Sequence, residues 1–129
     1  MTFPPEERRG AGLAAEERAC RHLERQGFTV AARNYRVPGG EIDIVARRDG
    51  LLVFVEVRSR EDASFGSPEE TVGARKRLRV AAAARRYISA APPGSWEEAR
   101  FDVIAIEGSG EEAELRHYEA AFDAKGKIL

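Results

Sequence analysis

The chain has 129 residues, of which 43% are hydrophobic and 33% are charged, and its formal net charge is −1 at pH 7. A chain of this length buries roughly two-thirds of its unfolded surface, which suits one compact domain. The net charge does not by itself indicate a nucleic-acid-binding protein. Cys20 is the only cysteine, so an internal disulfide is excluded. We find neither a signal peptide nor a membrane-length apolar run, and we predict a cytoplasmic protein with no membrane partner.

The chain is expected to begin with a short leader and a helix. Residues 1–10 contain two prolines and four charged residues without helical periodicity, and we interpret them as a flexible N-terminal leader. The single domain is therefore expected at residues 11–129. The pattern is helical from Ala11 to Gln26, and Gly27 is expected to cap the C-terminal end of this helix.

Glu16 lies on the apolar side of this predicted helix. It precedes Ala19 by three residues and Leu23 by seven, so its side chain projects toward the apolar stripe. A solvated glutamate is not expected there. Glu16 is either an acidic ligand of a site or a surface glutamate at the edge of the stripe, and the pattern leaves both interpretations open.

Two strands are predicted next. The first is Phe28–Val37, and the turn at residues 38–40 leads into the second, EIDIVA at residues 41–46. Acidic and aliphatic residues alternate in the second strand, and alternate residues of a strand share a face. Its two expected faces are therefore Glu41, Asp43 and Val45 on one side, and Ile42, Ile44 and Ala46 on the other.

A third strand, LLVFVEV at residues 51–57, carries Glu56 inside an apolar run. Asp49-Gly50 is a strong signal for a two-residue hairpin turn. Such a turn pairs Arg48 with Leu51, and this register places Asp43 opposite Glu56 and Glu41 opposite Arg58.

Two carboxylates on facing strands require a cation between them. At about 5 Å their repulsion is on the order of 3 kcal/mol for an effective dielectric near 20. The candidate cations are Arg58 and a hard divalent ion such as Mg²⁺, Mn²⁺ or Ca²⁺, which carboxylate and carbonyl oxygens suit. Alternatively, Glu56 is only a salt-bridge partner of Arg58 or Arg60.

The second predicted helix is strongly basic. Ser67, Pro68 and Glu70 are typical of a helix start, and the helix is expected to run to about Ala90. No acidic residue occurs between Thr71 and Trp96. The basic side chains are either a solvated face or a nucleic-acid contact. Those assigned to nucleic-acid binding are Lys76, Arg75, Arg79 and, from the preceding loop, Arg60.

Two further strands complete the predicted order. Arg100–Ile106 reads as a buried strand and Glu112–Tyr118 as an edge strand. His22, His117 and Cys20 are too scattered in the sequence for a zinc site or a Cys-His pair. Helix, three strands, helix and two strands favour an α/β fold with a central mixed sheet of about five strands flanked by helices, in the order αβββαββ.

These motifs resemble those of a known family. The runs GEIDIVA, FVEVRSR and FGSPEE, followed by Lys76 and RFDVI, are similar in content and order to the YraN-like family of uncharacterised bacterial proteins. An Asp followed by Glu-x-Lys resembles the signature of the PD-(D/E)xK nuclease superfamily, and implies a restriction-endonuclease-like fold. Arg58 stands where that signature has lysine. The resemblance also favours Glu16 as a ligand and implies that Lys76 points toward the acidic site and a phosphate.

The first functional hypothesis is a Mg²⁺- or Mn²⁺-dependent endonuclease acting on DNA, in repair or recombination. Asp43 and Glu56 are its expected catalytic carboxylates and would hold the metal with the backbone carbonyl of Val57 and with Glu16. Arg58 is the expected catalytic cation, and stabilises charge on the phosphate. A non-catalytic nucleic-acid-binding module is the second hypothesis. A protein-interaction domain with an acidic face ranks third, and the oligomeric state, including a homodimer, stays open.

Overall fold

The computed structural model describes the backbone of residues 5–60, 72–108 and 112–129, and the side chains of residues 13–59, 72–108 and 112–129. The elements are α1 Pro5–Arg25, β1 Thr29–Val37, β2 Gly40–Arg48, β3 Leu51–Arg60, α3 Ala74–Ala90, β4 Glu98–Glu107 and β5 Glu114–Phe122. Their order confirms the predicted α/β arrangement αβββαββ. Among the described helices, none is both long and apolar enough to cross a membrane.

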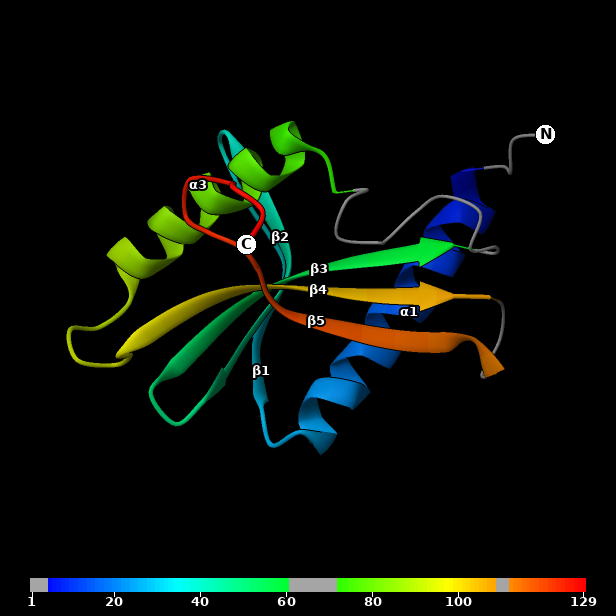
Figure 1. Cartoon of the computed structure of the whole chain (residues 1–129), viewed down its shortest axis with the longest axis horizontal. Coiled ribbons are helices and arrows are strands. Elements are labelled where there is room, and N and C mark those ends of the chain that lie inside the picture. Colours follow the sequence, from blue (N-terminus) through cyan, green and yellow to red (C-terminus); the bar gives the residue numbers. More distant parts are fainter. Residues whose placement is uncertain (1–4, 61–71, 109–111) are drawn as a thin grey trace.

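The five strands form one mixed sheet in the order β1-β2-β3-β4-β5. Only β3 and β4 are parallel, so the chain between them must cross over the sheet, and α3 lies in this crossover. One apolar cluster joins α3 to the sheet through Val80, Phe54 and Phe122. A second cluster joins α1 to the sheet through Leu23 and Val55. One described helix therefore packs on each face of the sheet, α3 on one and α1 on the other (Figure 1).

Helix α1 ends as predicted but begins earlier. Gly27 has φ +89, its N–H donates to the carbonyl of Glu24 at 3.0 Å, and the Phe28 N–H donates to the carbonyl of Leu23 at 3.0 Å. This is a Schellman motif, in which glycine adopts the left-handed conformation. The predicted start at Ala11 was wrong, because α1 begins at Pro5 within the segment interpreted as a leader. Proline is well suited to the first helical position, where no backbone N–H donor is needed.

The basic helix is shorter than predicted. Helix α3 begins at Ala74, and Gly73 before it is extended at φ −61 and ψ 159. A single helix from Ser67 was therefore wrong at Val72 and Gly73, and the predicted start itself lies outside the described residues. Its predicted end at Ala90 is confirmed. Strand β5 is Glu114–Phe122 rather than Glu112–Tyr118, and at its end Phe122 pairs with Phe101 of β4 and stacks on its ring at 5.1 Å.

Gly40 sets how closely α3 approaches the sheet. A Cβ atom at this position would overlap the carbonyl oxygen of Arg79 and lie 2.9 Å from the backbone nitrogen of Ala83. The first residue of β2 therefore packs directly against the backbone of α3. Because Glu41 follows Gly40, the same close approach holds a β2 carboxylate next to the basic helix.

We expect Gly40→Ala to lower the free energy of unfolding by about 3 kcal/mol or more, because both overlapping groups belong to the helix backbone and cannot rotate away. Gly39→Ala is the matched control. Gly39 has φ +88 but nothing within 4 Å of an added Cβ, so only about 1 kcal/mol of backbone strain is expected. Chemical denaturation of both variants measures the difference. Equal losses would contradict close packing at Gly40.

Candidate active site

The hairpin between β2 and β3 has the predicted register up to the acidic residues. Arg48 pairs with Leu51, and the pairing continues to Ile44 opposite Val55, where the ladder ends. The predicted pairs of Asp43 with Glu56 and of Glu41 with Arg58 do not form in it. Instead, an Asp43 carboxylate oxygen accepts a hydrogen bond of 2.9 Å from the Val57 backbone N–H. A side chain thus takes the place of a backbone acceptor at the point where the strands stop pairing.

This interruption also changes the faces of β2. The simple alternation predicted Ile42, Ile44 and Ala46 on one side of the sheet. Ile44 and Ala46 do pack in the cluster under α1, but Ile42 packs with Val45 in the cluster under α3. The alternation fails because Asp43 reaches toward β3 instead of lying on either apolar face.

Glu56 is the most unusual side chain of the site. It is only 1% exposed, and its Oε1 atom has no hydrogen-bond partner among the described residues. Its Oε2 atom lies 3.6 Å from the ammonium nitrogen of Lys76. Burial raises the pKa of the Glu56 carboxyl to about 8, and the neighbouring charge of Asp43 adds to the increase. The group is therefore largely protonated at neutral pH and would gain a partner from any cation that reaches it.

Asp43 belongs to the same cluster. Burial raises the pKa of its carboxyl, while the Val57 N–H and the charge of Lys76 lower it and leave a net increase. The charges of Glu16 and Glu41 also raise this pKa. Several carboxylates therefore share one partly buried region, and each disfavours ionisation of the others.

Lys76 is the cation of this cluster. Its ammonium nitrogen lies 2.7 Å from Glu41 Oε1 as well as 3.6 Å from Glu56 Oε2. The hydrogen bond from Lys76 is the main reason that the pKa of Glu41 is lowered. The pKa of Lys76 itself is raised, because the carboxylates outweigh the effect of its burial. Lys76 is therefore protonated and held chiefly by Glu41, which leaves Glu56 only partly compensated.

Glu16 approaches the cluster from α1. Its Oε2 atom accepts a hydrogen bond of 3.1 Å from the side-chain amide of Asn34, and Arg33 lies 3.8 Å away. Asn34 lies within β1 and has φ 51. The charge of Glu16 also contributes to the raised pKa of Asp43, and its role as a ligand stays a prediction.

The other predicted site residues in the described part of the chain form no ion pair with Glu56. Arg58 is half-buried and makes no ion pair with the described residues, so Lys76 has the contact that the predicted register gave to Arg58. Arg75 and Arg79 are exposed on α3, and the charge of Arg79 contributes to the lowered pKa of Glu41. The side chain of Arg60 lies outside the described part of the chain.

Sequence analysis did not identify Glu41 as a site residue. The available signal was its position beside Asp43 in the run Glu41-Ile42-Asp43. What could not be predicted was its contact with Lys76, because that contact depends on how α3 docks beside Gly40.

The suitability of the site for a metal ion rests on its donor atoms. Among the described residues, no three His, Cys, Asp or Glu side chains are already arranged as a metal centre. Nevertheless, the donor atoms of Glu56 and its acidic neighbours are carboxylate oxygens. One of them, Oε1 of Glu56, is buried and has no hydrogen-bond partner among the described residues. Hard cations such as Mg²⁺ and Mn²⁺ prefer oxygen ligands, so the donor set fits the expected metal.

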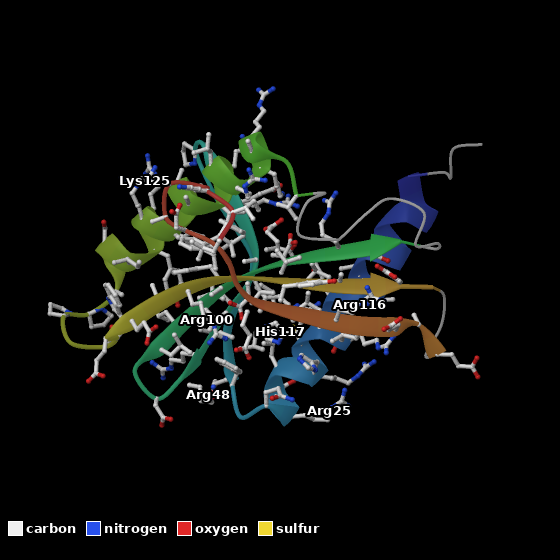
Figure 2. The ribbon with its side chains drawn as sticks, viewed as in Figure 1. Arg25, Arg48, Arg100, Arg116, His117 and Lys125 are labelled. Carbon is white, nitrogen blue, oxygen red and sulfur yellow. The ribbon has the colours of Figure 1, made fainter. Side chains whose placement is uncertain are left out.

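A second polar cluster ties α1 to the far strands of the sheet. Asp102, which is 0% exposed, accepts hydrogen bonds from Arg100 at 2.8 and 2.9 Å and from the Ala120 N–H at 3.0 Å. His117 Nε2 donates to the same carboxylate at 2.7 Å, and its Nδ1 lies 3.0 Å from His22 Nε2. Figure 2 shows Arg100 and His117 beside the crossing strands. The two histidines are therefore not scattered, as the sequence had suggested, but meet in a network that the fold satisfies internally.

Comparison with known proteins supports one family. A model of the uncharacterised protein family UPF0102 matches residues 15–106, a span that includes Glu16, Asp43, Glu56 and Lys76. A UPF0102 protein of Myxococcus xanthus is 48% identical over 120 residues, which cover 93% of this chain and 94% of the relative. Another, from Syntrophotalea carbinolica, is 42% identical over 126 residues, covering 98% and 99%.

The buried Glu56 carboxyl should make stability depend on pH. Its pKa is about 8 in the folded protein against an ordinary value of 4.5, so the folded state holds a proton that the unfolded chain releases. The free energy of unfolding should therefore fall as pH rises from about 4.5 to about 8. Glu56→Gln removes this contribution, and we expect its Tm in chelator to exceed that of the wild type increasingly across this interval.

Glu114→Gln is the control, because Glu114 is exposed and pairs only with Arg116 among the described residues. Thermal melts from pH 5 to pH 9 would measure both differences. A constant difference between Glu56→Gln and the wild type would show that Glu56 has an ordinary pKa.

Proposed function

Because the chain belongs to the uncharacterised protein family UPF0102, whose description leaves its activity open, we propose a function from the site itself: a metal-dependent endonuclease that hydrolyses DNA phosphodiester bonds. The observation that carries this proposal is Glu56, a buried carboxyl with an unpartnered oxygen and a raised pKa beside Asp43. A group that only stabilised the fold would be expected to have its hydrogen bonds satisfied. Strongly perturbed carboxyls of this kind are typical of functional sites.

The proposed metal ligands are Asp43, Glu56, the backbone carbonyl of Val57 and Glu16. Asp43 is already oriented, because the Val57 N–H holds one of its oxygens. Glu56 would give up its proton on binding Mg²⁺ or Mn²⁺, and its unpartnered oxygen would gain a ligand bond. When bound, such an ion would lower the pKa of a coordinated water and neutralise charge on the phosphate.

Lys76 is proposed as the cation that contacts the reacting phosphate. It is protonated and reaches the carboxylates from α3, on the opposite side from α1 and Glu16. Glu41 holds its ammonium group at 2.7 Å and so limits where it can move. Lys76 would thereby do the work of the signature lysine that this chain lacks on β3. Arg58, two residues beyond Glu56, is proposed to orient the phosphate, since a guanidinium can donate two parallel hydrogen bonds.

The proposed partner is nucleic acid, and DNA in particular, because α3 concentrates positive charge beside the site. Arg75 and Arg79 are exposed next to Lys76, and the helix contains no acidic residue. Phosphate contacts of this kind supply most of the sequence-independent affinity for DNA.

A second candidate function is a nucleic-acid-binding module without catalysis. One observation favours it. Lys76 already pairs with Glu41 and lies 3.6 Å from the Glu56 carboxyl, so the cluster does not need an ion in order to persist. The two functions differ in one requirement, because only the nuclease needs a divalent ion at the carboxylates.

The decisive test is cleavage of labelled DNA by purified protein in Mg²⁺ or Mn²⁺. We expect the wild type to cleave, and Asp43→Asn and Glu56→Gln each to abolish both cleavage and metal binding measured by calorimetry. Neither variant should have a lower Tm in chelator, because each removes like charge from a crowded site. Glu114→Gln should behave as the wild type. If the wild type binds DNA but cleaves it in neither metal, the nuclease proposal fails and the non-catalytic binding module is the remaining candidate.

The roles of Lys76 and Arg58 can be separated by substitution. We expect Lys76→Met to lower kcat/KM by more than tenfold, which corresponds to at least about 1.4 kcal/mol of transition-state stabilisation. Arg58→Ala should cost less, and Arg58→Lys should keep or raise the rate. Single-turnover cleavage measures all three. A larger loss for Arg58→Ala than for Lys76→Met would show that Arg58 on β3, and not Lys76, is the catalytic cation.

A further inference from the structure

A groove lies beside the C-terminal half of α3, away from the carboxylates. Its volume is about 650 Å³. The turn between β1 and β2 forms one wall, and the helix forms the other. The residues that line it are Pro38, Ala82, Arg85, Arg86, Ser89 and Ala90. Two guanidinium groups and a hydroxyl therefore converge on a surface that otherwise offers small apolar side chains.

The positive charge of this groove is not compensated by the fold. Arg85 and Arg86 are exposed neighbours, and neither makes an ion pair with the described residues. Some other arginines are paired, as Arg33 is with Glu17 and Arg100 with Asp102. Ser89 Oγ donates to the Arg85 carbonyl at 2.9 Å and keeps its lone pairs. An anion with several acceptor oxygens would satisfy both guanidinium groups at once.

The groove lies in line with the candidate active site. Arg75, Arg79 and Arg86 follow one another at i, i+4 and i+11, so they share one face of α3. The first two lie beside Lys76, and Arg86 lies in the groove. At 1.5 Å per residue, Arg86 is about 15 Å along the helix from Lys76. With α3 parallel to the duplex axis, along which the phosphates of one strand rise about 3.4 Å per nucleotide, this length corresponds to about four nucleotides.

We infer that this groove binds a second backbone phosphate of the substrate strand, about four nucleotides from the phosphate at Lys76. The inference rests on the proposed function, because it takes Lys76 as the contact of the scissile phosphate. Arg85 and Arg86 donate to the phosphate oxygens, while Pro38 and Ala82 give the adjoining sugar an apolar wall. Arg79, which lies between the two positions, and Arg75, which precedes Lys76, guide the strand along the exposed face of the helix.

The matched comparison is between two pairs of arginines on opposite sides of the sheet. Arg85→Gln/Arg86→Gln removes two charges from the groove. Arg21→Gln/Arg25→Gln removes two charges from the exposed face of α1 and is the control. Figure 2 shows Arg25 on α1, well away from α3. Each variant changes the net charge equally, so a general electrostatic effect would appear in both.

The first measurement is affinity for a duplex in chelator at several salt concentrations. We expect Arg85→Gln/Arg86→Gln to bind about tenfold more weakly, with a plot of log K against log salt that is shallower by about 0.9, the value for one phosphate contact. The control should change neither quantity by a comparable amount. Equal losses in the two variants, no loss in the groove variant, or no binding of DNA by the wild type would each overturn the inference.

The second measurement places the contact. Single neutral methylphosphonate linkages are introduced in turn along the cut strand, with the cut site of the wild type as reference. Affinity should fall most at about four nucleotides from the cut, and this minimum should vanish in the groove variant. Cleavage without such a minimum would overturn the inference and leave the nuclease proposal intact. The expected salt dependence without cleavage in any divalent ion would overturn the nuclease proposal and leave the groove as a phosphate site.

Discussion

The burial of the Glu56 carboxyl inside an apolar strand is the constraint on which the site depends. The run that precedes it, from Leu52 to Val55, contributes side chains to both apolar clusters and holds β3 in the centre of the sheet. Glu56 is therefore desolvated by the same packing that makes the fold, and its pKa rises to about 8. Asp43, Lys76 and Glu41 all act on this buried carboxyl, because their charges affect how easily Glu56 ionises.

The docking of α3 decides which cation reaches Glu56. The helix backbone touches Gly40, where no side chain can intervene, and the next residue is Glu41. This contact places Lys76 between Glu41 and Glu56, at 2.7 and 3.6 Å. A helix held farther away by a larger residue could not deliver a lysine to the same place. A packing feature of the hairpin thus determines the electrostatics of the site.

Features that depend on interactions between residues close in the sequence could be predicted, whereas features that depend on contacts between distant residues could not. The element order, the Asp49-Gly50 hairpin and the Gly27 cap follow from local patterns, and the structure agrees with all three. The pairing of Asp43 with Glu56 failed because alternation assumes an uninterrupted ladder, whereas the Asp43 side chain itself ends that ladder. The meeting of His22 with His117 could not be predicted, because it joins residues 95 positions apart through the packing of α1 on the sheet.

Two buried carboxylates on adjacent strands differ in how fully the fold supplies them with partners. Asp102 on β4 is 0% exposed, but His117, Arg100 and Ala120 all donate to it. These bonds outweigh the effect of burial and lower its pKa, so the charge is permanent and the network is complete. Glu56 on β3 is equally buried, yet one of its oxygens has no partner in the described part of the chain and its pKa is raised. The same sheet can therefore supply a buried acid with all its partners. The incomplete set of partners at Glu56 is thus a property of that site, and it is the strongest support for the proposal that the site binds a cation.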